Sequence, residues 1–407
     1  MIRDKIIDYI RSGEKAEKDY AIGFEIENFI VDKNNNAITY WDEGGVKDIL
    51  EDLIKIGYEA VYVGGVLLGA TKGKTAISLE PGSQFELSIK KAWHIKELED
   101  EYFRCMKEIE EVVHKRGYHI LQRGYHVKTK IDEIKILPKE RYDLMYKYFN
   151  ESGSMGHNMM KGTAASQSSI DYKDEEDFRR KMRVYNALSP VFYAIFENTN
   201  IFEGEAYKEN GLRMTIWKNT DKERCSIIKE AFDDDFSYAS YADYIVNRPC
   251  IFIHKNGEDI YTGHTKIKDI EGIDEADKTI VEHVLSMFFP DTRAKKYIEI
   301  RMMDSVQIDY LLGLVALIKA ISYQNLDKVY EMIKDVTYDD ALKALDSFKE
   351  SGIRGKLKDR SFLDIAKDLI SLAKASLGDE AHYLNALEEV IDSGKSIREV
   401  NFEKYGL

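Results

Sequence analysis

ISLEPGSQFELS, at residues 77–88, is the stretch that decides the fold of this 407-residue chain. Polar and apolar side chains alternate on both sides of a Pro81-Gly82 break, a pattern that predicts two strands joined by a tight bend. Successive side chains of a strand point to opposite faces of its sheet. Glu80 stands just before the bend, and the second strand has a polar face of Gln84, Glu86 and Ser88 and an apolar face of Phe85 and Leu87.

Two other stretches repeat this acidic alternation. GFEIENFIV at residues 23–31 places Glu25 and Glu27 on one face, and YIEIR at residues 297–301 does the same with Glu299. A sheet built from these strands has one apolar face, packed on helices, and one face lined by carboxylates. Clustered carboxylates suit Mg²⁺, which takes a few of them and leaves its other positions to water and phosphate oxygens. Each strand taken alone also fits a half-exposed antiparallel strand whose polar face meets water.

The composition is that of a globular protein with a sizeable core. Apolar residues make up 44% of the chain and charged residues 32%, which excludes a disordered chain. The formal net charge of −14 argues against a nucleic-acid partner, because phosphate binding depends on clustered Lys and Arg. The N-terminal stretch lacks the apolar segment of a signal peptide, and the densest late apolar run, residues 311–318, is far shorter than the roughly 20 residues that cross a bilayer. We therefore expect a cytoplasmic protein without a membrane partner.

The three cysteines show no CxxC spacing and the histidines no HExxH motif, so the sequence predicts neither a disulfide framework nor a zinc site. No feature of the sequence indicates an oligomeric state.

Strand patterns come first along the chain and helical patterns last, which indicates an α+β protein. Apolar residues recur at helical spacing from about residue 309 to residue 393. We expect a catalytic domain over residues 1–305 and a helical C-terminal extension over residues 306–407 that packs on it. The predicted strands are at residues 23–31, 60–66, 76–87, 119–128, 164–172, 212–217, 250–263 and 297–301, and the predicted helices before residue 309 include residues 1–12, 44–56 and 93–116.

The stretch at residues 77–88 closely resembles the LEPGGQFELS motif of the plant and proteobacterial type of glutamate-cysteine ligase. Further matches follow in the family's order: GFEIE at 23–27, LPKERY at 137–142, MGHNMM at 155–160, QSSIDY at 167–172, RMTIW at 213–217, DKER at 221–224 and YIEIR at 297–301. The resemblance covers roughly residues 20–320. It implies a glutamine-synthetase-like fold, in which a curved antiparallel sheet with flanking helices carries Mg²⁺ and ATP on its concave face.

The resemblance also implies the reaction, which belongs to glutathione biosynthesis. The γ-carboxylate of glutamate takes the γ-phosphoryl group of ATP, and the amine of cysteine attacks the resulting acyl phosphate. Carried over position by position, the expected ligands of Mg²⁺ or Mn²⁺ are Glu25, Glu27, Glu80, Glu86 and Glu299. The expected nucleotide contacts are Gln84, Ser88 and Arg301, and the expected substrate contacts are Arg141, Arg213, Trp217 and Gln167.

Two arginines are candidates for the catalytic role. Phosphoryl transfer needs metal ions and cations opposite the charge that develops on the phosphoryl oxygens, and Arg224 and Arg301 are expected to supply that positive charge. Arg141 and Arg213 are expected to pair with the α-carboxylate of glutamate, because the guanidinium group binds a carboxylate through two parallel hydrogen bonds. Each arginine also fits a structural ion pair.

Departures from the family pattern leave the second substrate open. Residues 167–171 read QSSID where the family reads QVNLD, residues 82–84 read GSQ in place of GGQ, and Cys225 follows Arg224 in place of Thr-Gly. One alternative is a related ligase that joins glutamate, or a similar acid, to a different small amine. A second is a non-catalytic relative that binds ATP or glutamate. A third, a phosphate-binding loop at GATKGKT, residues 69–75, is disfavoured because its first Gly is one residue too close and a strand follows it.

Overall fold

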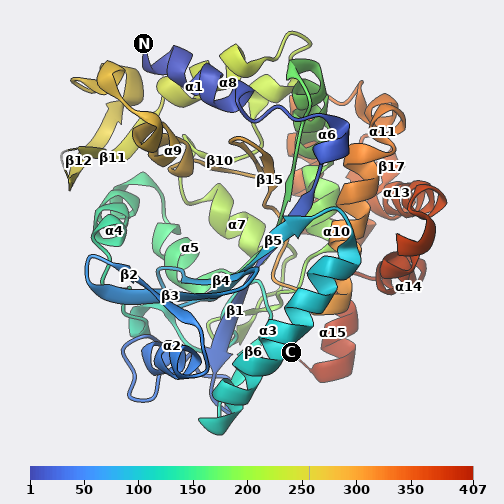
Figure 1. Ribbon diagram of the computed structural model, residues 1–407. Coiled ribbons are helices and arrows are strands. Elements are labelled where there is room, and N and C mark those ends of the chain that lie inside the picture. Colours follow the sequence, from blue (N-terminus) through green and yellow to red (C-terminus); the bar gives the residue numbers. More distant parts are fainter. Residues whose placement is uncertain (256, 407) are drawn as a thin grey trace.

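Nine strands form the central sheet, in the computed structural model that describes residues 1–255 and 257–406 (Figure 1). Every neighbouring pair in this sheet is antiparallel. Eight strands follow one path, in the order β14 (Thr292–Ala294), β15 (Ile298–Ile300), β7 (Ser166–Ile170), β1 (Ile22–Val31), β5 (Phe85–Ala92), β4 (Thr75–Leu79), β3 (Val66–Lys72) and β2 (Glu59–Val63), and β6 (His119–Leu121) pairs with the last part of β1. The expected α+β class with an antiparallel sheet is confirmed.

The apolar face of the sheet is built from the side chains that alternate with the glutamates. Phe24, Ile26, Leu87, Ile298 and Ile300 are all buried. Three helices cover the sheet: α2 (Val46–Lys55) contacts β2 and β3, α3 (Ile95–Lys115) contacts β5 and β6, and α10 (Ile308–Tyr323) contacts β1 and β7. Helix α3 buries residues at spacings of three and four along one stripe, and α10 is buried on nearly all sides, as expected for a helix that is apolar all round.

Shorter helices stand over the opposite, polar face: α4 (Glu140–Ser152), α5 (Gly156–Gly162) and α7 (Leu212–Lys218) (Figure 1). The remaining helices are α1 (Ile2–Arg11), α6 (Glu175–Ile195), α8 (Tyr238–Val246), α9 (Lys278–Ser286), α11 (Leu326–Ile333), α12 (Tyr338–Ser351), α13 (Phe362–Ser376), α14 (Asn385–Asp392) and α15 (Ile397–Tyr405). The remaining strands pair as β8 (Ile201–Phe202) with β9 (Glu205–Ala206), β10 (Cys225–Ser226) with β13 (Phe289–Pro290), β11 (Pro249–Lys255) with β12 (Glu258–Lys266), and β16 (Lys356–Leu357) with β17 (Arg360–Ser361).

Two predicted strands are wrong or too long. Residues 212–217 form helix α7, because Gly211 takes a left-handed conformation (φ 70°) and the helix then buries Leu212 and Ile216, one turn apart. Residues 119–128 contain only the short strand β6. Residues 69–75 lie in the β3–β4 hairpin, whose turn includes Gly73 (φ 64°), and no helix begins after them, so a phosphate-binding loop is excluded there.

The C-terminal helices share one continuous core with the rest of the chain. The helical character predicted for residues 309–393 is confirmed. A single apolar cluster runs from Ile2 to Ile397 and includes α6, α10 and α13. The division into residues 1–305 and 306–407 stays a prediction. Among the described residues, no helix is both long and apolar enough to span a bilayer.

Candidate active site

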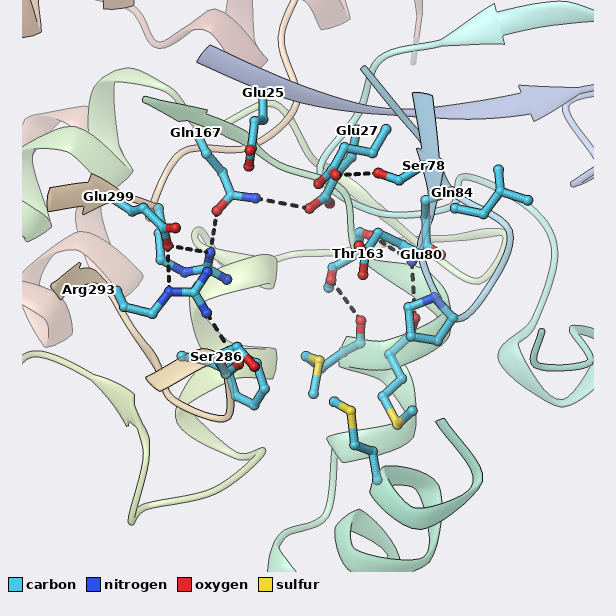
Figure 2. Close-up of a pocket in the computed structure, with 18 of the residues that line it drawn as sticks. Glu25, Glu27, Ser78, Glu80, Gln84, Thr163, Gln167, Ser286, Arg293 and Glu299 are labelled. Carbon is cyan, nitrogen blue, oxygen red and sulfur yellow. Dashed lines mark hydrogen bonds and ion pairs between the residues drawn. The ribbon is translucent and has the colours of Figure 1, made fainter. Parts of the chain in front are cut away.

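A cavity of about 370 Å³ opens on the polar face of the sheet (Figure 2). Its floor is formed by strands β1, β4, β5, β7 and β15, and its walls by α4, α5, α7 and the segment that carries β14. The charged side chains that line it are Glu25, Glu27, Glu80, Glu86, Glu299, Lys139, Lys295, Arg141, Arg213, Arg293 and Arg301. All five glutamates predicted from the sequence therefore lie around one cavity.

Four of these carboxylates, those of Glu25, Glu27, Glu80 and Glu86, are neighbours without ion-pair partners in the described part of the chain. Glu27 stands directly opposite Glu86 in the β1–β5 pairing, and like charges in this arrangement destabilise a sheet. Among the described residues, none of Glu25, Glu27, Glu80 and Glu86 makes an ion pair with a basic side chain. Burial and the nearby Glu80 raise the pKa of Glu27 to about 8. Burial and the three neighbouring carboxylates raise the pKa of Glu86 well above its usual range.

This cluster fits a cation that arrives together with phosphate. No three His, Cys, Asp or Glu side chains among the described residues converge closely enough to enclose a metal ion by themselves. Mg²⁺ rarely uses such a closed cage; it takes one or two carboxylates and completes its octahedron with water and substrate phosphates. A divalent cation bound there would offset both burial and the repulsion between carboxylates, which together raise the pKa values of Glu27 and Glu86. Carboxylates without ion pairs on an open cavity wall are the donor set that such an ion requires.

Glu299 has different surroundings from the other four. Its Oε2 accepts a hydrogen bond from Arg293 Nε at 2.5 Å, and its Oε1 lies 3.0 Å from Lys295 Nζ. Arg301 Nη1 lies 3.5 Å from Oε2. Burial alone would raise the pKa of Glu299, but these three cations outweigh it and hold the pKa far below its usual range. The structure thus places Glu299 in the cavity with its charge already balanced by basic side chains.

Gln167 connects the two charged regions of the cavity. Its Nε2 donates to Glu27 Oε1 at 3.2 Å, and its Oε1 accepts a hydrogen bond from Arg301 (Figure 2). Ala165 N donates to the other oxygen of Glu27 at 2.8 Å. Gln167 therefore links Glu27 to Arg301, the residue that directly follows strand β15. The orientations of these two charged side chains are coupled through it.

Three predicted substrate contacts have buried donor atoms without partners. Arg141 Nε, Arg213 Nε and Trp217 Nε1 are buried and find no hydrogen-bond acceptor among the described residues. Arg213 also donates from Nη1 to Met302 O at 3.1 Å and from Nη2 to Arg301 O at 3.2 Å, which fixes its plane. Neither arginine pairs with a carboxylate within the described chain. Buried donors without acceptors are costly, so these three indicate a ligand that brings acceptor oxygens.

Gln84 lines the cavity, yet its amide is used within the protein. Its Oε1 accepts from Gly82 N at 2.8 Å, and its Nε2 donates to Met160 O and Thr163 O. The neighbouring Ser83 has a left-handed backbone (φ 73°), the conformation that suits the Gly of the family's GGQ. Its Oγ accepts a hydrogen bond from Tyr40 N at 2.9 Å, which a glycine could not provide.

The structure does not bring Arg224 or Ser88 to this cavity. Arg224 is fully buried, and its guanidinium donates to Asp221 at 2.5 Å, to Met287 O at 2.8 Å and to Tyr148 Oη at 3.0 Å. The placement corrects the expectation that Arg224 faces the phosphates, because every branch of its guanidinium is held by the protein. Ser88 is opposite Glu25 in register but lines a smaller adjoining cavity of about 230 Å³ with Lys91.

Three basic residues of the site, Arg293, Lys295 and Lys139, were not predicted from the sequence. Arg293 and Lys295 line the cavity from β14 and the turn after it. The signal was present: in TRAKKYIEIR, residues 292–301, these side chains alternate with Ala294 in strand fashion just before the acidic strand. Lys139, which also lines the cavity, lies within the quoted LPKERY motif; burial and the neighbouring Arg141 lower the pKa of its ammonium group.

Comparison with known proteins identifies the family that this chain matches. The model of glutamate-cysteine ligase family 2 (GCS2) matches residues 21–400. The chain is 30% identical to the chloroplastic glutamate-cysteine ligases of Brassica juncea and Arabidopsis thaliana, with all of this chain covered and 81% and 80% of theirs. A crystal structure of the Francisella tularensis glutamate-cysteine ligase in complex with AMP has a similar fold, with a TM-score of 0.59 at 13% identity, covering 96% of this chain and 85% of that one. The chain belongs to glutamate-cysteine ligase family 2.

Proposed function

We propose that this protein is an ATP-dependent ligase that joins the γ-carboxylate of glutamate to the amine of cysteine through γ-glutamyl phosphate. One observation carries the proposal. Four glutamates without ion pairs and two arginines without carboxylate partners line the same cavity of the described chain, on the polar face of one sheet. The four glutamates lack a cation, which Mg²⁺-ATP would supply. The two arginines lack a carboxylate, which the substrate glutamate would supply.

The carboxylate cluster supports the nucleotide side of the reaction. Glu27, Glu80 and Glu86, with Glu25, are the residues that would hold Mg²⁺. Bound there, Mg²⁺ would neutralise the phosphate oxygens and orient the γ-phosphoryl group for in-line attack. Arg301 is held at the junction between Gln167 and Glu299, which keeps its guanidinium beside the cluster without entering it. We assign to Arg301 the stabilisation of charge on the transferring phosphoryl group.

The arginines of the walls support the glutamate side. Arg141 on α4 and Arg213 on α7 line the cavity, each has a buried Nε without an acceptor, and the Trp217 ring lies 5.7 Å from the Arg213 guanidinium. These residues would hold the α-carboxylate and so leave the γ-carboxylate directed towards the metal-bound phosphate. Holding two reactants in this way converts a bimolecular step into an effectively unimolecular one.

The acceptor is proposed as cysteine because the named relatives are glutamate-cysteine ligases. Ser168 and Ser169 replace two residues of the family's QVNLD motif, and neither lines the main cavity. The Ser168 hydroxyl donates to Gly23 O at 2.9 Å, and Ser169 lines the adjoining smaller cavity with Glu25 and Tyr297. Both of these substitutions therefore lie outside the lining of the reaction cavity.

A panel of amines tests this proposal. Purified protein is incubated with Mg²⁺-ATP and glutamate plus cysteine, 2-aminobutyrate, glycine, methylamine or no amine, and ADP is measured by a coupled assay. The proposal predicts the largest kcat/KM with cysteine, a smaller value with 2-aminobutyrate, and little ADP with the others. ADP formation with methylamine but not with cysteine would overturn the acceptor assignment, and ADP formation with none of the amines would overturn the ligase itself.

A further inference from the structure

The C-terminal helix α15 contacts the chain that leads into helix α7, which carries Arg213. Arg398, in the first turn of α15, donates from Nη1 to Glu197 Oε1 at 2.9 Å, and its backbone N donates to Glu197 O at 2.7 Å. The same Nη1 donates to Glu209 O and to Asn210 Oδ1, each at 3.0 Å. One side chain of α15 therefore binds both ends of the segment between α6 and α7.

Glu197 connects Arg398 to the first turn of α7. Its Oε1 also accepts a hydrogen bond from Gly211 N at 2.6 Å, and Gly211 directly precedes the helix. The left-handed conformation of Gly211 (φ 70°) suits only glycine here, because a Cβ would lie 2.7 Å from Phe348 Cε1. Helix α7 has seven residues, too few to be stable alone, so its direction depends on such contacts. Arg213 is its second residue.

The backbone that holds the Arg213 guanidinium is bound to the same segment. The guanidinium donates to the carbonyl oxygens of residues 301 and 302, and Asp304, a little further along, accepts through Oδ2 from Asn198 N at 2.8 Å. Asn401 of α15 donates to Asn198 Oδ1, also at 2.8 Å. The segment after α6 thus connects α15 both with the start of α7 and with the backbone to which Arg213 donates.

The charge of Glu197 depends on Arg398. The Glu197 side chain is 3% exposed, and Arg398 is its only ion-pair partner within the described chain. Burial raises the pKa of Glu197 to about 7, whereas Arg398 and the Gly211 amide oppose that rise. Without the arginine, the buried carboxylate would take up a proton or move towards water. In either case the hydrogen bond that it accepts from Gly211 N would weaken.

We propose that Arg398 is a positioning residue for glutamate binding: through Glu197 it fixes the start of α7, and so the direction in which Arg213 faces the reaction cavity. The inference rests on the proposed function, in which Arg213 holds the α-carboxylate of glutamate. The lining of the reaction cavity includes neither Arg398 nor Glu197, so Arg398 acts without touching the substrate. The C-terminal helix thereby contributes to the affinity for glutamate.

Steady-state kinetics on the whole protein, with glutamate and ATP varied in turn, test this inference. Arg398→Met removes the charge but keeps an apolar stem. It should raise the KM for glutamate about fivefold or more, with a change of less than about twofold in the KM for ATP. Arg398→Lys should keep the glutamate KM within about twofold of the unsubstituted value, because one ammonium group can replace the single nitrogen that makes the three side-chain contacts. Glu403→Ala removes an exposed ion pair with Lys395 at the same helix and should change neither KM.

A double variant separates positioning from a general loss of stability. Added to Arg213→Lys, Arg398→Met should raise the glutamate KM by less than about twofold, because both substitutions then act on one interaction and their effects do not add. Circular dichroism establishes that each variant is folded at the assay temperature. If Arg398→Met does not fold, Arg398→Gln, which also removes the charge, takes its place, and the glutamate KM should again rise while the ATP KM does not.

Three results would overturn the inference. These are an unchanged glutamate KM in the folded neutral variant, equal rises in the KM values for glutamate and ATP, or a full rise in the glutamate KM when Arg398→Met is added to Arg213→Lys. A failure of the proposed function is distinguishable from all three, because the unsubstituted protein would then form no ADP with glutamate and cysteine.

Discussion

Glu27 stands directly opposite Glu86 across the β1–β5 pairing, and no basic side chain of the described protein forms an ion pair with either. Such a pair weakens the sheet that holds it, and the proposed Mg²⁺ would relieve the repulsion between its two carboxylates. Glu299 lines the same cavity, and three cations lie around its carboxylate. The cavity thus combines one region that needs a cation with another in which the charges are balanced.

Glu86→Gln should stabilise the metal-free protein while abolishing ADP formation. Glutamine keeps an acceptor for the Ser78 hydroxyl, which lies 2.6 Å from Glu86, and removes the repulsion from Glu27. A carboxyl whose pKa is raised on folding costs stability above its unfolded pKa, so near pH 8 the free energy of unfolding should rise by about 1 kcal/mol. Urea denaturation checks the first effect and a coupled ADP assay the second. The exposed strand glutamate variant Glu59→Gln should change neither; lower stability or normal turnover in Glu86→Gln would contradict the assignment.

Arg213→Lys should impair glutamate binding and leave ATP binding nearly intact. Lysine keeps the positive charge but loses the planar fork that two parallel hydrogen bonds to a carboxylate require. The KM for glutamate should rise about tenfold or more, with a change of less than about twofold in the KM for ATP. Steady-state kinetics with each substrate varied in turn give both values, and Arg354→Lys, at an exposed arginine, is the matched control. The reverse pattern would move Arg213 to the nucleotide side.

Arg224→Met should lower the free energy of unfolding, because it leaves Asp221 buried without its partner. Removing one member of a buried ion pair costs about 3–5 kcal/mol. The double variant Arg224→Met/Asp221→Asn should recover much of that loss, and the kcat per folded molecule should stay close to the unsubstituted value in both. Thermal denaturation combined with active-site titration measures these quantities. A variant of normal stability with a kcat reduced about a hundredfold would instead support a catalytic Arg224.

The free energy of unfolding should decrease as the pH is lowered, because of His126. This ring is buried against Phe29, with centroids 3.9 Å apart, and neither nitrogen has a partner among the described residues. Burial lowers the pKa of His126 to about 3, against about 6.5 in the unfolded chain. Between these values only the unfolded chain binds the proton, so this residue destabilises the fold by up to about 1.4 kcal/mol per pH unit as the pH falls below about 6.5.

To test this, the free energy of unfolding is measured by denaturation for the protein and for His126→Gln from pH 7.5 to pH 5. The variant should show a shallower loss of stability over this range, and His94→Gln, at an exposed histidine, should follow the unsubstituted curve. Parallel curves for the protein and His126→Gln would contradict the assignment.

Local patterns predicted most of the sheet and the glutamate face. The alternation at residues 23–31 and 297–301 is a property of neighbouring residues, so the burial of Phe24 and Ile298 and the cavity position of Glu25 and Glu299 follow from a period of two. Helix α7 was misjudged because five residues, RMTIW, fit a period of two and a helical turn equally well.

The rest of the site depends on contacts far apart in sequence. Whether Arg224 faces phosphate or Asp221 is decided by the packing of Met287 and Tyr148 around it, which no local pattern contains. Ser88 lies on the predicted face of β5, but the reaction cavity does not extend as far as this residue. The charge balance around Glu299 likewise arises from Arg293 on the neighbouring strand.

The most direct test of the account follows oxygen through the reaction. Glutamate labelled with ¹⁸O in its γ-carboxylate is converted with Mg²⁺-ATP and cysteine, and the released phosphate is examined by ³¹P NMR. The account predicts that each phosphate carries one ¹⁸O from glutamate, because the γ-carboxylate attacks the γ-phosphoryl group in the cavity lined by Glu27, Glu86 and Arg213. Formation of γ-glutamylcysteine with unlabelled phosphate would contradict the acyl phosphate route and the roles assigned to these residues.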